Sequence, residues 1–155
     1  MMTEDATDRV ARIRRAFDAA FQRMCEAENP EAAEDELSNV LSQVYRLSEV
    51  VKDKLGKGIF YKAMLATNDR RMARAATWAR TFDTHDAVVV AEMADIVTDY
   101  YTEMYGTLAW RPLDELPNQA GNHDEHLDYA AQLAGHGVLD TVRQAFDTLA
   151  AMVCS

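Results

Sequence analysis

Apolar residues recur at steps of three and four along the first third of the chain. Over residues 7–27 they alternate with arginines and aspartates in this way (Val10, Ile13, Phe17, Ala20, Phe21 and Met24). Over residues 30–55 a longer stripe has the same spacing (Leu37, Val40, Leu41, Val44, Leu47, Val51 and Leu55). Because an α-helix turns once in 3.6 residues, this spacing puts the apolar side chains on one face. The pattern predicts two amphipathic helices.

The residues between these helices contain a stop signal and a start signal. Pro30 cannot continue the first helix, but it suits the first position of the second. Asn29 can cap that helix, and the acidic residues after it favour the positive end of the helix dipole. Gly56 is the expected terminator. Because the connection is short, we expect an antiparallel hairpin.

Shorter patterns predict the helices that follow. A brief helix is expected over residues 58–67, and another begins at Asn68 or Asp69 and carries apolar side chains as far as Phe82. Asp83 can cap a further helix, in which apolar side chains step by three and four before Gly106 (Val90, Met93, Val97, Tyr100 and Met104). Tyr and Met are common at interfaces, so this helix or the last one is expected to form a homodimer.

Residues 107–155 have a mixed pattern. One extended piece is expected around residues 108–110, and helices over residues 124–134 and 138–153 flank a Gly-His-Gly break. The chain has 155 residues, enough to bury a core without disulfides or metal. We predict an all-α fold: a single helical domain over residues 1–155, with an antiparallel core bundle over about 7–106 and a C-terminal helical extension over 107–155.

The net charge of −10 is unevenly distributed along the chain. Residues 52–80 carry eight basic and two acidic side chains, and every lysine of the protein lies there. This segment is either a solvated face that matches an acidic face of a partner, or a local phosphate site. In the second case Lys57, Arg70, Arg71 and Arg74 are candidate anion-binding residues. The repulsive overall charge disfavours general nucleic-acid binding.

Neither a membrane-spanning segment nor a signal peptide is recognisable in the sequence. The two cysteines, Cys25 and Cys154, suggest no disulfide framework. No Gly-rich phosphate loop, nucleophile elbow or zinc pattern is present. We therefore expect a cytoplasmic protein with no membrane partner, no cofactor and no metal.

Arg80 and His85 flank the predicted helix break at Asp83. On one continuous helix, five residues correspond to about 140° of rotation, and the two side chains would not share a face. If the helix breaks, both can point into the corner between the two helices. An anion there would meet a permanent guanidinium charge, N-terminal amides and a titratable imidazole. Those groups can cleave a phosphodiester without metal.

The neighbours of this pair are candidates for a supporting role. Asp83, Thr84 and Asp86 are expected to orient the two catalytic side chains. The simpler interpretation is that Arg80 pairs with Asp83 or with a glutamate of the second helix, and that His85 helps to cap.

The Arg-x4-His motif late in a bundle, after a helical hairpin, resembles the signature of the HEPN superfamily of small four-helix proteins. Members with this motif include metal-independent RNases, typically homodimers, in toxin–antitoxin, abortive-infection and phage-defence systems. The segment Trp-Ala-Arg-Thr-Phe-Asp-Thr-His-Asp (residues 78–86) and the segment Trp-Arg-Pro-Leu-Asp-Glu-Leu-Pro (residues 110–117) are also similar to uncharacterised proteins of actinobacteria and their phages. The resemblance implies that Arg80 binds the scissile phosphate of an RNA substrate, that His85 acts as acid or base, and that a cognate antitoxin is a partner.

Two alternatives remain open from the sequence. A non-catalytic helical interaction protein of phage origin would use its acidic face to bind a basic protein partner. His123-Asp124-Glu125-His126, with Asp128, places metal-capable side chains at i and i+3. A polar loop that opens a helix explains the same residues more simply. Separately, His85-Asp86, His123-Asp124 and Asp140 resemble, in order only, the scattered ligands of HD phosphohydrolases.

Overall fold

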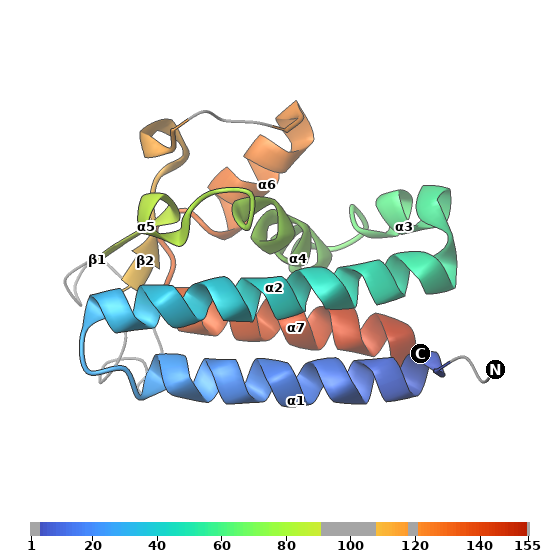
Figure 1. Ribbon diagram of the computed structural model, residues 1–155. Coiled ribbons are helices and arrows are strands. Elements are labelled where there is room, and N and C mark those ends of the chain that lie inside the picture. The colour runs from blue at the N-terminus through green and yellow to red at the C-terminus, as the bar shows by residue number, and fades with distance from the viewer. Residues whose placement is uncertain (1–3, 91–107, 118–120, 155) are drawn as a thin grey trace.

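The computed structural model describes residues 4–90, 108–117 and 121–154. Along the chain lie helices α1 (Ala6–Cys25), α2 (Pro30–Leu55), α3 (Lys57–Ala63), α4 (Asn68–Ala79) and α5 (Thr84–Ala87), strands β1 (Val88–Val90) and β2 (Leu108–Trp110), a 3₁₀ turn (Leu113–Glu115), and helices α6 (His123–Gln132) and α7 (Val138–Cys154). The all-α prediction is confirmed: α1, α2 and α7 lie side by side, α4 packs against α2 and α7, and α6 packs against α4 (Figure 1).

The predicted α1–α2 hairpin is present, with the caps that the sequence indicates. The Asn29 side chain accepts a hydrogen bond from the Ala32 amide at 2.9 Å, and Pro30 occupies the first turn of α2. Gly56 ends α2 with φ of 85°, a conformation that glycine adopts without steric cost. At α4 the cap is Thr67, one residue before the expected Asn68, and its hydroxyl accepts from the Arg70 amide.

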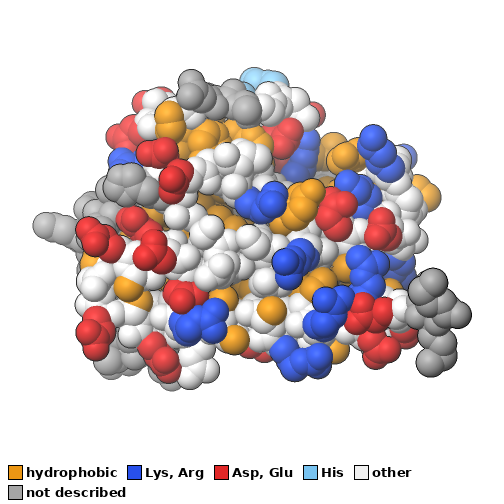
Figure 2. All heavy atoms as spheres, viewed as in Figure 1, with side chains coloured by type: hydrophobic (Ala, Val, Ile, Leu, Met, Phe, Trp, Pro, Cys, Tyr) orange, Lys and Arg blue, Asp and Glu red, His pale blue; other side chains and the backbone are white. Residues whose placement is uncertain are grey.

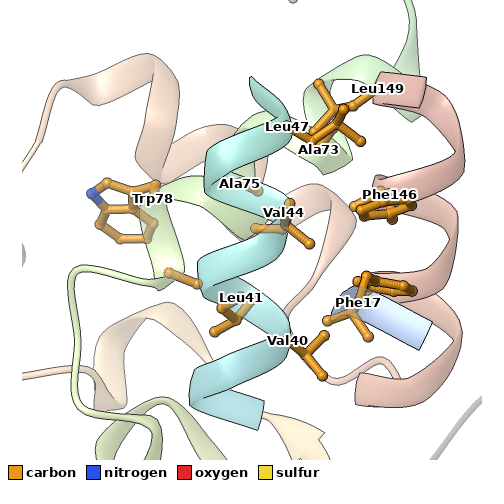
Figure 3. Close-up of a cluster of buried hydrophobic side chains, with 14 of the residues drawn as sticks. Phe17, Val40, Leu41, Val44, Leu47, Ala73, Ala75, Trp78, Phe146 and Leu149 are labelled. Atoms are coloured by element: carbon orange, nitrogen blue, oxygen red, sulfur yellow. The ribbon is translucent and has the colours of Figure 1, made fainter. Parts of the chain in front are cut away.

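The C-terminal helix α7 belongs to the core of the bundle. Phe146 of α7 is fully buried and stacks on Phe17 of α1 with ring centroids 4.1 Å apart. Val40, Val44 and Leu47 of α2 point toward the same side chains (Figure 3). We expected residues 107–155 to form an extension, but the continuous apolar stripe of α7 requires burial, and α1, α2 and α4 all pack against it.

The segment after the predicted helix break differs from our prediction. We expected one long helix from Asp83 to Met104, but α5 is a single turn and β1 follows it directly. β1 pairs antiparallel with β2, with Val88 opposite Trp110 and Val90 opposite Leu108. Three consecutive β-branched residues favour this extended conformation when a partner strand is available. The expected continuation through Met93, Val97, Tyr100 and Met104 lies outside the described residues.

Trp110 of β2 is held on α7 by a buried hydrogen bond. It is fully buried, and its indole Nε1 donates to the Thr141 hydroxyl at 2.7 Å. That hydroxyl lies 2.9 Å from the Gly137 carbonyl oxygen, to which it donates in turn. The hydrogen bond therefore fixes the two-stranded sheet on the bundle.

Thr141→Val is expected to lower the free energy of unfolding by about 2 kcal/mol, because it leaves the buried indole N–H without an acceptor. Urea unfolding of the two proteins measures the difference. Thr148→Val is the matched control, since Thr148 lies half-buried on the same helix. Equal stability of the two variants would show that the Trp110 hydrogen bond contributes nothing measurable.

Candidate functional site

Arg80 lies at the corner where α4 ends. α4 stops at Ala79, Arg80 is its C-cap, and α5 begins at Thr84. The Thr81 hydroxyl donates to the Trp78 carbonyl oxygen at 2.7 Å and so holds the end of the helix. The predicted break between Arg80 and His85 is therefore present in the backbone.

The Arg80 guanidinium stacks on an aromatic ring of α2. Its Cζ lies 4.0 Å from the centroid of the Tyr45 ring, and the arginine is exposed. Among the residues that the structure describes, Arg80 makes no ion pair, so the simpler interpretation with a carboxylate partner is wrong there. A cation–π contact uses the face of the guanidinium and leaves its in-plane N–H donors available.

His85 lies in α5, five residues after Arg80, and its side chain falls outside the described part of the structure. Thr84 ties this turn to α2, because its hydroxyl donates to the Glu34 carbonyl oxygen at 3.1 Å. Asp83 and Asp86 are exposed. We expected helix N-terminal amides to help bind an anion at this corner, but a single turn such as α5 has only a small dipole.

Three of the predicted anion-binding residues make hydrogen bonds inside the protein. Arg71 and Arg74 each place Nη1 3.1 Å from one carboxylate oxygen of Asp128 on α6. Arg70 donates to the Ala63 carbonyl oxygen at 3.4 Å. Lys57, at the start of α3, is exposed. Much of the basic segment therefore has a structural role that the charge pattern did not reveal.

The sequence placed Asp128 only in a metal-capable cluster, and its structural role was missed. Its side chain is only 2% exposed, and two guanidinium groups bind its two oxygens. An ionised carboxylate this deeply buried needs such partners. Arg74 also donates to Asn122 Oδ1 at 3.3 Å, and Asn122 caps α6. The pair of arginines thus fixes α6 on α4, and an acidic residue next to the buried Tyr129 was the available signal.

Two grooves meet at Tyr45. The larger has a volume of about 610 Å³ and is walled mainly by α2, α3, α4 and the start of α6, with the aromatic rings of Tyr45, Phe60, Tyr61 and Trp78 and the polar side chains Thr77 and Asn122. The smaller has a volume of about 300 Å³ and lies between α1 and α2, lined by Arg9, Arg12, Ile13, Tyr45, Arg46 and Glu49. Arg80 stacks on the ring that both grooves share.

The charges around these grooves are unequal. In the view of Figure 2, Lys and Arg side chains gather on the half of the molecule toward α3 and the N-terminus, and mainly Asp and Glu show on the opposite half. Glu49 lines both grooves, but Lys52 binds its carboxylate at 3.0 Å. The surface around Tyr45 combines aromatic rings with arginines, which suits phosphate and bases alike.

No protein-family model, curated protein or solved structure matches the chain. Within residues 4–90, 108–117 and 121–154, no three His, Cys, Asp or Glu side chains converge in a way that could hold a metal ion. His126, one of the metal-capable residues of the cluster at residues 123–126, packs against the Trp78 ring with ring centroids 5.1 Å apart. In the same residues no helix combines the length and apolarity of a bilayer span.

Proposed function

We propose that this chain is a HEPN-like protein that cleaves single-stranded RNA without a metal ion, using Arg80 and His85. The observation that supports the proposal is the Arg80–Tyr45 stack. It holds an exposed guanidinium at a helix break, with no carboxylate bound among the described residues. A preorganised cation of this kind is what a charged phosphoryl transition state requires.

The proposed reaction uses the RNA itself as the nucleophile. The 2′-hydroxyl attacks the adjacent phosphorus, its proton passes to a base, and the bond from phosphorus to the 5′-oxygen breaks. The leaving 5′-oxygen takes up a proton, so the products are a 2′,3′-cyclic phosphate and a 5′-hydroxyl. Arg80 binds the non-bridging oxygens of the phosphate, where negative charge develops. His85 moves the proton, because an imidazole titrates near neutral pH.

The proposed biological role and partners rest on the same resemblance to HEPN proteins. We propose a toxin or phage-defence role in the cytoplasm, with a homodimer as the active form and a cognate antitoxin as its partner. Size-exclusion chromatography with light scattering tests the dimer, and toxicity on expression tests the biological role.

A second candidate is non-catalytic binding of a basic protein partner. The observation that favours it is the acidic rim of the larger groove, where Asp124 and Glu125 of α6 face the aromatic wall. Aromatic rings beside carboxylates suit an arginine or lysine side chain of a partner. In this case the wild-type protein binds such a partner and RNA remains intact.

The deciding experiment is RNA cleavage in EDTA by wild type and His85→Ala. We expect the wild-type protein to cleave single-stranded RNA and His85→Ala to be slower by about 10³-fold, because a proton-transfer group contributes about 10² to 10⁴. His136→Ala is the matched control, since His136 lies in the turn before α7. Equal rates for wild type and His85→Ala would remove His85 from the mechanism.

A further inference from the structure

The geometry points to a second phosphate-binding site, in the smaller groove, which holds the RNA phosphate next to the one at Arg80. The inference rests on the proposed function, because it extends the same substrate beyond the reacting bond. Its central residue is Arg46, on α2 directly after Tyr45. Arg9 and Arg12 of α1 form the opposite wall.

Within the part of the chain that the structure describes, Arg46 is the arginine of this groove that takes part in no ion pair. It is exposed, and among the described residues no carboxylate pairs with it. A guanidinium without an internal partner keeps all its donors for a ligand, and its planar fork matches the oxygens of a phosphate. Arg46 is therefore positioned to make a phosphate contact at no structural cost.

Arg9 and Arg12 can add to this contact because their own ion pairs are exposed. Arg9 lies 3.4 Å from Asp53, and Arg12 lies 2.8 Å from Glu4. Exposed pairs of this kind contribute about 0 to 1 kcal/mol each, so a phosphate can compete with the carboxylates. Both carboxylates lie in exposed positions from which their side chains can move away.

Tyr45 connects the second site to Arg80. Its ring lines both grooves, and the Arg80 guanidinium covers it. A strand that lies across this ring has one phosphate at Arg80 and the next at Arg46, while a base can enter the larger groove and stack on its aromatic side chains. Tyr45 is then a positioning residue that holds Arg80 at the first phosphate, next to the groove that binds the second.

The arrangement selects a short single strand. The smaller groove lies between two helices, with the aromatic rings of the larger groove beyond Tyr45, and bases must be unstacked to reach those rings. A chain with a net charge of −10 repels a long polyanion, so binding is limited to the few phosphates that contact these arginines.

Fluorescence anisotropy with a labelled single-stranded RNA of about 12 nucleotides tests the site. Titrations are made in EDTA on His85→Ala protein, so that the RNA stays intact, and at several salt concentrations. Adding Arg46→Ala is expected to weaken binding about fivefold and to reduce the slope of log K against log salt by about 0.7, the value of one phosphate contact on a single strand. A merely structural role for Arg46 would not change this slope.

Arg23→Ala is the matched control, since Arg23 lies on α1 far from the groove and is bound to Glu36 at 3.0 Å. It removes the same charge and is expected to leave the slope unchanged. An unchanged slope in Arg46→Ala, or no RNA binding at all, overturns the inference. Binding of a poly-glutamate peptide that depends on Arg46, with no binding of RNA, would instead assign the groove to an acidic protein segment.

Cleavage assays on proteins with His85 intact separate this inference from the proposed function. RNA binding that depends on Arg46, without any cleavage by the wild type, leaves the second site standing and contradicts the nuclease. Cleavage by the wild type that is unaffected by Arg46→Ala at low substrate concentration leaves the nuclease standing and contradicts the second site.

Discussion

Arg80→Lys is expected to slow RNA cleavage by about 10²-fold although the positive charge is kept, and Arg80→Ala by about 10³-fold. The reason is geometric. The guanidinium is planar, so it can lie on the Tyr45 ring and still offer donors from its edge. A lysine ammonium is a point charge on a flexible stem, and it cannot stack and bind two oxygens at once. Single-turnover cleavage rates in EDTA measure both effects.

Arg23→Lys is the control for the Arg80 series, because it makes the same exchange at a distant exposed site on α1. Thermal unfolding of each variant shows whether the fold is kept. Equal cleavage rates for Arg80→Lys and wild type would mean that only the charge at this corner matters. The Tyr45 stack would then have no part in the mechanism.

Asp128→Ala is expected to lower the free energy of unfolding by about 3 kcal/mol, because it removes the buried carboxylate that both Arg71 and Arg74 bind. For a chain of this size the midpoint of thermal unfolding should fall by about 6 to 12 °C. Arg71→Ala should cost less, since the Arg71 side chain is 39% exposed and Arg74 still binds Asp128. Urea unfolding of the single and double variants measures the coupling between them.

Asp124→Ala is the control for Asp128→Ala, because Asp124 is an exposed acidic residue of the same helix. A loss below about 0.5 kcal/mol for Asp128→Ala would contradict the structural role of the ion pairs. It would also return Arg71 and Arg74 to the set of candidate anion-binding residues.

The long helices could be predicted because each has a local signal. The apolar stripes of α1, α2 and α7 are continuous. Asn29 and Pro30 mark the start of α2, and Gly56 marks its end. β1 could not be predicted in this way. Val88, Val89 and Val90 also fit a helical stripe, and the pairing with residues 108–110 that makes them a strand is not a local property.

The candidate site was predictable only in part. The helix break beside Arg80 has a local signal in Asp83, and the structure contains it. The part played by Tyr45 has no local signal. Tyr45 lies off the apolar stripe of α2, and its contact with Arg80 joins residues 35 positions apart in the sequence. The role of Arg71 and Arg74 was missed for the same reason, since their partner Asp128 lies more than 50 positions later in the sequence. A count of charges cannot tell a paired arginine from an available one.

The most direct test of the account is the chemistry of the RNA ends. Single-stranded RNA is incubated with the wild-type protein in EDTA, and the products are identified by mass spectrometry. We predict fragments with a 2′,3′-cyclic phosphate and a 5′-hydroxyl, and none when a 2′-deoxynucleotide replaces the nucleotide before the cleaved bond. Intact RNA after incubation with the wild type, or cleavage that proceeds equally at the 2′-deoxy position, would contradict a metal-independent RNase at Arg80 and His85.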